Sequence, residues 1–170
     1  MTLSQILLTG AGILALATAA TYLIPSKVEV ERTAIIDATP QAILQLASSN
    51  TGYQAFNPYK STDPNLKITL FGPDSGVGSG FHFDGKDGKG SQTVSQISDT
   101  SVTYDIDLGS MGKPTQSLTV TPVDTGTQVT WRMETDMGLN PIARVFGLFM
   151  DRMIGKTFEA GLANLAKATA

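Results

Sequence analysis

The sequence predicts an α+β fold in which a seven-stranded antiparallel sheet is covered by one long C-terminal helix. Residues 65–136 contain short segments of alternating apolar and polar residues, separated by turns rich in glycine, aspartate and serine. Residues 141–167 instead place apolar side chains at helical spacing without a break. A sheet and a helix that each have one apolar face are expected to bury those faces against each other.

The chain opens with an uncharged segment, residues 3–24. As a helix this segment would be about 33 Å long, enough to cross a hydrocarbon core of about 30 Å. We therefore expect residues 1–26 to form a single-pass transmembrane anchor and a short joint, which places the protein in a membrane. A cleaved signal peptide with Ala17-Thr18-Ala19 at its cleavage site is the alternative, although no Lys or Arg precedes the apolar stretch. The sequence leaves open which side of the membrane holds the remaining residues 27–170.

The first predicted strand leads directly into a helix. Residues 28–37 alternate apolar and polar side chains, as a half-buried strand does. Thr39 is a suitable N-cap and Pro40 suits the first helical position, so a helix is expected from Pro40 to about residue 47. Residues 51–56 are expected to form another turn of helix that ends before Asn57-Pro58. Two short helices are therefore predicted after the first strand.

Six further strands are predicted as an antiparallel meander. They are residues 67–71, 78–84, 90–97, 101–108, 115–123 and 128–135. Alternation places aromatic and aliphatic side chains on one face of this sheet and polar side chains on the other. The only histidine, His82, falls on the polar face together with carboxylates such as Asp84, Asp105 and Glu134.

The last predicted helix begins at Asn140-Pro141, a good cap and first-turn pair, and continues to about Lys167. Its apolar stripe is expected to face the apolar side of the sheet. The space between them is either a packed core or a ligand cavity with an adaptable, methionine-containing wall, and the sequence does not favour one over the other. The candidate cavity-lining residues are Phe56, Tyr59, Phe81, Phe83, Tyr104, Trp131, Met133, Phe146, Met150 and Met153.

Composition excludes several functional classes. Acidic residues number 15 and basic residues 12, without a marked basic cluster, so a nucleic acid is not an expected partner. The absence of cysteine excludes disulfides and thiolate nucleophiles, and a single histidine excludes a multi-histidine metal site. We therefore expect no metal and no cofactor. A general base needs a pocket, which the solvent-facing His82 lacks, so we expect no catalytic residue and favour a non-enzymatic role.

Five landmarks carry a resemblance to a known family. They are Arg32–Pro40, Asn57-Pro58-Tyr59, Gly76–Phe81, Gly126–Trp131 and Glu159–Leu162. In this order the chain resembles the helix-grip fold of the SRPBCC superfamily, also called START-like or birch-pollen-allergen-like, and within it the polyketide cyclase/dehydrase and lipid transport group. The resemblance covers residues 27–167. It implies that the sheet is curved around the C-terminal helix, and that relatives often carry one N-terminal hydrophobic segment.

The resemblance also implies the range of functions. Residues 27–170 are expected to form one helix-grip domain that binds or transfers a small hydrophobic ligand, such as a lipid, isoprenoid or polyketide-like molecule, in an apolar cavity at a membrane. A polyketide cyclase/dehydratase-like enzyme is the first alternative, and it would need polar groups that converge inside the cavity. A co-chaperone-like protein-interaction domain is the second, and it would show a filled core and an exposed apolar patch. A fold alone does not decide among these functions.

Overall fold

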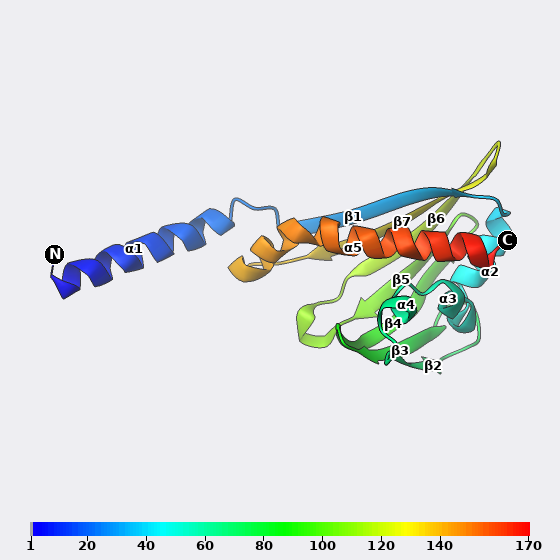
Figure 1. Cartoon of the computed structure of the whole chain (residues 1–170), viewed down its shortest axis with the longest axis horizontal. Coiled ribbons are helices and arrows are strands. Elements are labelled where there is room, and N and C mark those ends of the chain that lie inside the picture. The colour runs from blue at the N-terminus through cyan, green and yellow to red at the C-terminus, as the bar shows by residue number, and fades with distance from the viewer. Residues whose placement is uncertain (1) are drawn as a thin grey trace.

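One antiparallel sheet organises the structure, and the computed structural model describes residues 2–170. Its seven strands are β1 (Lys27–Ile36), β2 (Lys67–Phe71), β3 (Gly80–Gly85), β4 (Gly88–Ser98), β5 (Ser101–Asp107), β6 (Thr115–Val123) and β7 (Gly126–Asp136). They lie in the order β1-β7-β6-β5-β4-β3-β2, and every neighbouring pair is antiparallel. The predicted seven antiparallel strands are confirmed, and the structure places the first strand beside the last (Figure 1).

A bulge and a tight turn shape the part of the sheet that faces the helices. The pairing of β4 with β5 shifts by one residue between Val94 and Gln96, which locally bends and twists β4. Strands β3 and β4 are joined by Lys86-Asp87 between the paired residues Gly85 and Gly88, and Gly88 has a φ of +126°. Such a φ is open to glycine at little cost, which permits a hairpin this short.

Three short helices, rather than the predicted two, connect β1 to β2. Helix α2 (Pro40–Ala47) begins as predicted, with the Thr39 side chain accepting a hydrogen bond from the Ala42 amide. Helix α3 (Asn50–Phe56) ends before Asn57-Pro58, also as predicted. The additional turn, α4 (Tyr59–Thr62), forms because the Pro58 backbone is already helical and the Asn57 side chain accepts a hydrogen bond from the Tyr59 amide.

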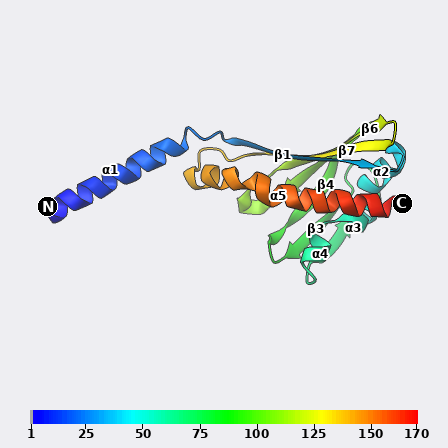
Figure 2. The ribbon, with the colours of Figure 1, turned by 45° about the horizontal axis from the view of Figure 1, so that its top comes forward.

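Helix α5 (Pro141–Ala168) runs unbroken along the sheet, as Figures 1 and 2 show. The Asn140 side chain caps it by accepting hydrogen bonds from the amides of Ile142 and Ala143. Most of its contacts with the sheet are with β1. The guanidinium of Arg32 on β1 lies against Gly155 and forms ion pairs with Asp151 and Glu159, and the Arg32 hydrogen bond lowers the pKa of Asp151.

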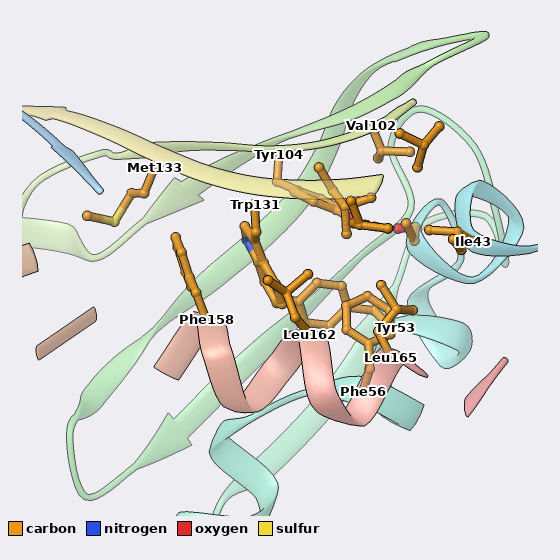
Figure 3. Packing of buried hydrophobic residues seen from close by; sticks show 14 of the residues in the cluster. Ile43, Tyr53, Phe56, Val102, Tyr104, Trp131, Met133, Phe158, Leu162 and Leu165 are labelled. Carbon is orange, nitrogen blue, oxygen red and sulfur yellow. Dashed lines mark hydrogen bonds between the residues drawn. The ribbon is translucent and has the colours of Figure 1, made fainter. Parts of the chain in front are cut away.

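The buried core lies between the sheet, helices α2 and α3, and the C-terminal half of α5. Its largest fully buried side chains are Trp131, Tyr104, Phe56 and Phe158. Figure 3 shows Phe158, Leu162 and Leu165 pointing from α5 into the core, where the ring of Trp131 stacks on Phe158. The inward parity that the sequence predicts for β5, β6 and β7 is confirmed by the burial of Tyr104, Leu118 and Trp131.

Helix α1 (Leu3–Thr21) projects away from the sheet (Figures 1 and 2). Within residues 2–170, no helix combines the length and the apolar character needed to cross a membrane. The predicted transmembrane anchor is therefore not supported. The regular helix has 19 residues, ends before Ile24, and contains two glycines and several hydroxyl side chains, which lower its mean hydropathy.

Candidate functional site

A cavity of about 470 Å³ lies between the inner face of the sheet and the N-terminal half of α5. Because α5 follows the edge strand β1, its first half does not fill the space above the inner strands. Phe158 on the second half of the helix is buried, whereas Phe146 and Met153 nearer its start line the cavity and remain 51% and 53% exposed. The remaining walls come from β3 to β7, from helices α3 and α4, and from Met111 in the turn after β5.

Aromatic side chains form the inner end of the cavity. Trp131 stacks on Phe158 with ring centres 4.9 Å apart and planes inclined by 10°. Tyr53 from α3 packs against Phe81, at 5.2 Å, and against the edge of Trp131, at 6.1 Å. Phe83 continues this surface towards the cavity opening. The wall is therefore flat and apolar over much of its area, a surface suited to aromatic or polyene groups.

Uncharged polar side chains interrupt this apolar wall. Tyr53, Tyr59, Gln92 and Gln116 all line the cavity. Burial raises the pKa of both tyrosines, with a smaller contribution from Tyr59 in the case of Tyr53 and from Asp87 in the case of Tyr59. Both hydroxyls are therefore protonated at neutral pH, when they can donate or accept hydrogen bonds but cannot serve as bases.

The buried carboxylate on the cavity wall is already engaged in structural hydrogen bonds. Asp63 is 7% exposed. Its two oxygens accept hydrogen bonds from the backbone amides of Asn65 and Lys86, at 3.0 and 2.7 Å. This carboxylate joins the end of α4 to the β3–β4 turn and thereby closes one end of the cavity.

The structure brings most of the sequence-predicted candidates to this wall. Those that line the cavity are Tyr59, Phe81, Phe83, Trp131, Met133, Phe146, Met150 and Met153. Phe56 and Tyr104 do not line it. Phe56 is fully buried against Trp131, and the Tyr104 hydroxyl donates a 2.8 Å hydrogen bond to the Ala47 carbonyl, so both side chains belong to the packed core. Whether the wall residues contact a ligand stays a prediction.

Of the polar wall residues, sequence reasoning named Tyr59 but missed Tyr53, Gln92 and Gln116. Gln92 lies opposite Phe81, and Gln116 lies opposite both Tyr104 and Met133. Strand parity therefore places both glutamines on the inward face of the sheet. They were missed because only apolar side chains were expected at inward positions. Tyr53 was missed because the short helix α3 presents too few residues to define a face.

The titratable groups named from the sequence lie outside the cavity. His82 is exposed on the opposite face of β3, with its ring 4.6 Å from that of Phe71. Glu134 forms an ion pair with Arg132 on that same outer face. Among residues 2–170 no group of three or more His, Asp and Glu side chains is arranged to hold a metal ion. The cavity wall itself also includes Asp87 and Lys89, so the site offers neutral hydroxyls and amides together with these two charged side chains.

Several solved structures share this fold. The KanY protein has a TM-score of 0.64 and 19% identity, over 84% of this chain and 97% of that one. Norcoclaurine synthase from Thalictrum flavum has a TM-score of 0.62 and 12% identity, over 85% and 97% of the two chains. The di-domain aromatase/cyclase StfQ of the steffimycin biosynthetic pathway has a TM-score of 0.59 and 14% identity, over 85% of this chain and 50% of that one.

Comparison at the sequence level identifies the family. No curated protein is similar enough in sequence to count as a relative. The family model described as polyketide cyclase / dehydrase and lipid transport, however, matches residues 27–170, the entire segment that forms the sheet, its connecting helices and α5. This membership supports a role in hydrophobic ligand binding or in cyclase-like chemistry. The chain thus belongs to the polyketide cyclase / dehydrase and lipid transport family.

Proposed function

We propose that the protein binds and carries a small hydrophobic molecule in the cavity beneath the N-terminal half of α5. The observation that supports this proposal is a cavity of about 470 Å³ that is lined mostly by aromatic, methionine and aliphatic side chains. Ligand sites in proteins commonly have volumes of roughly 300 to 1,000 Å³ and apolar walls of this kind. The space is therefore adequate for a lipid chain, an isoprenoid or a fused aromatic system.

Apolar burial can supply the affinity. Removing about 300 Å² of apolar ligand surface from water contributes roughly 7 kcal/mol before the costs of association are subtracted. Five methionines, Met111, Met133, Met137, Met150 and Met153, line the cavity and allow its wall to adapt to ligands of different shape. Binding in the micromolar range is the expected outcome for a well-fitting ligand.

The experiment that tests binding compares two tryptophan substitutions on α5. Met150→Trp places a larger side chain in the cavity, whereas Phe149→Trp alters a neighbouring side chain that is 57% exposed and does not line the cavity. We expect calorimetric titration with fatty acids, isoprenols and fused aromatics to show binding to the unchanged protein and to Phe149→Trp. Met150→Trp should bind at least tenfold more weakly while it unfolds at a similar urea concentration. Equal binding by both variants would place the ligand elsewhere.

A cyclase- or dehydratase-like enzyme is the second candidate. It is favoured by the hydroxyls and amides of Tyr53, Tyr59, Gln92 and Gln116 on the cavity wall. Such groups can donate hydrogen bonds to a carbonyl and assist its enolisation or attack by a carbanion. The raised pKa values leave both tyrosines protonated, so the proton lost from an acidic C–H group of the substrate would have to pass to solvent water. Incubation with a poly-β-ketone mimic, followed by mass spectrometry for loss of water, tests this candidate.

A protein-interaction role of the co-chaperone type, the third candidate, predicted a filled core. The cavity favours the ligand-binding proposal instead.

We also propose that the ligand is exchanged at a lipid surface. This proposal is supported by the exposed apolar side chains of α1, including Leu14 and Leu16, and by Leu139 and Ile142 where α5 begins. Both groups lie at the end of the molecule from which α1 projects (Figure 1). Arg144 connects them, because its guanidinium donates hydrogen bonds to the carbonyls of residues 22 and 24.

Sedimentation with phosphatidylcholine vesicles tests the surface proposal. The double variant Leu14→Glu/Leu16→Glu should lose vesicle binding, because charges are costly to bury among lipid chains. The control Thr121→Glu/Thr125→Glu adds the same charge at exposed positions in and beside the β6–β7 turn and should retain it. Equal binding by both double variants, or none by the unchanged protein, would contradict the proposal.

A further inference from the structure

The side-chain amide of Gln116 is fixed in one orientation by Trp131. The indole Nε1–H of Trp131 donates a 3.0 Å hydrogen bond to Oε1 of Gln116. An indole nitrogen can only donate, so the amide oxygen must face it. The reversed amide would place an N–H group of Gln116 against the N–H group of Trp131, and neither could accept a hydrogen bond. Gln116 consequently directs its Nε2, with two N–H groups, away from Trp131.

Trp131 is itself held in place from several sides. Its ring stacks on Phe158 of α5. The rings of Tyr53 and Phe56 pack against it in T-shaped arrangements, with ring centres 6.1 and 5.8 Å from that of Trp131. The side chain is only 1% exposed. The direction of the Gln116 amide is therefore set by the packed core and does not depend on whether a ligand is present.

The amide nitrogen of Gln116 opens on the cavity. Gln116 belongs to the cavity wall on the inner face of β6, where it lies between Tyr104 of β5 and Met133 of β7. Among residues 2–170 no acceptor pairs with its Nε2, and this atom is not sealed off from the cavity space. A donor in an apolar wall is unfavourable unless water or a ligand accepts its hydrogen bonds. The position thus calls for an acceptor that comes from the cavity.

We infer that the ligand carries a hydrogen-bond acceptor oxygen, of the ketone, ester or quinone class, which receives the Nε2–H of Gln116. This inference rests on the proposed ligand-binding function and adds a specificity-determining residue to it. The apolar part of the ligand then extends along Phe81, Phe83 and Met153 towards the cavity opening. A purely hydrocarbon ligand would leave Gln116 unpaired or hydrated, whereas a carbonyl oxygen replaces the water that otherwise satisfies it.

A matched pair of probes tests this assignment. 2-Acetylnaphthalene and 2-isopropenylnaphthalene have nearly the same shape, but the first carries C=O where the second carries C=CH₂. Calorimetric titration of the full chain measures both affinities, and ¹⁵N spectra follow the side-chain amide signal that Gln116→Met removes. In the unchanged protein we expect the ketone, and not the alkene, to shift this signal.

Two methionine variants give the decisive comparison. Gln116→Met keeps the length of the side chain but removes the N–H donor. It should therefore lower the affinity for the ketone about tenfold, which is the effect of losing one hydrogen bond to a neutral group. The affinity for the alkene should change by less than about threefold, since the packing of the side chain is retained. Gln92→Met is the control, because it removes the other amide of the same wall and should affect the two probes alike.

The outcomes separate the inference from the proposed function. If neither probe, nor any fatty acid or isoprenol, binds the unchanged protein, the proposed function fails. If both probes bind and Gln116→Met weakens them equally, the cavity binds ligands but Gln116 does not read an acceptor oxygen. Loss of the ketone preference in Gln92→Met alone would transfer the role to that residue and overturn the assignment. Should Gln116→Met unfold, Gln116→Glu replaces it, because glutamate keeps an acceptor oxygen for the Trp131 indole but removes the N–H donor, with the urea midpoint confirming that the variant is folded.

Discussion

Gly161 of α5 is the position where one added methyl group should most directly disturb the core. A Cβ at this residue would lie 2.4 Å from Cζ3 of Trp131, and ordinary contact begins near 3.4 Å, so the ring or the helix must move by about 1 Å. The ring has little freedom, because it is stacked on Phe158 and bonded to Gln116. Overpacking a closed core costs about 1 to 3 kcal/mol, while glycine to alanine in a helix gains about 1 kcal/mol. We therefore expect Gly161→Ala to lower the free energy of unfolding, by up to about 2 kcal/mol.

Gly147 on the same helix supplies the control. Its Cβ would approach Cγ2 of Val28 at 2.8 Å, but Val28 is only partly buried and a change of its χ1 angle moves this atom away, so Gly147→Ala should be close to neutral. Urea unfolding, followed by circular dichroism and by the fluorescence of the only tryptophan, measures both variants. Because the Trp131 ring orients the Gln116 amide through a hydrogen bond, its displacement in Gly161→Ala should also reduce ketone binding. If Gly161→Ala proved as stable as Gly147→Ala, the conclusion that the Trp131 ring is held rigidly in the core would be wrong.

Three further outcomes are expected. Burial raises the pKa of Tyr53 and Tyr104 above the ordinary value of 10.0, so above this pH the unfolded chain loses protons that the folded state keeps. The contribution of these tyrosines to stability should therefore fall as the pH rises above about 10, and Tyr53→Phe should reduce this fall in urea midpoints measured from pH 8 to 11. Tyr104→Phe removes the buried hydrogen bond to the Ala47 carbonyl and should cost about 1 to 2 kcal/mol in the same assay, and an unchanged midpoint would count against a packed role for this hydroxyl. His82→Ala should leave probe binding unaltered, since the side chain is exposed on the outer face; a lost activity would move the site to that face.

Local signals in the sequence were enough to predict most of the fold. Alternation along residues 28–37 and 101–135 reflects a sheet with one buried face, and the Asn140-Pro141 pair marks the start of α5 because capping is a local interaction. The extra turn α4 was missed because Pro58 was interpreted only as a helix terminator, whereas it also begins the next turn. The transmembrane helix was expected from the length and the absence of charge of residues 3–24, but the regular helix ends at Thr21 and does not combine the length and apolar character of a membrane span.

The candidate site was predictable only in part. The faces of Phe81, Trp131 and Met133 follow from strand parity, so their presence on one wall could be expected. Whether that wall encloses space depends on where α5 crosses the sheet, and this depends on long-range contacts such as those of Arg32 with Asp151. The donor on Gln116 was beyond sequence reasoning, because its direction depends on a diagonal contact with Trp131 across two strands.

The order of strands has a consequence for how the chain reaches its folded state. The edge strand β1 pairs along its full length with β7, residue 27 opposite residue 136 and residue 36 opposite residue 127, although nearly the whole family domain separates them in sequence. During synthesis β1 therefore leaves the ribosome with no strand to pair with until β7 has also emerged. Forming such distant pairings late and against loop-closure entropy makes folding slow. Until that moment the apolar side of β1, which α5 finally covers, is open to any factor that protects nascent chains.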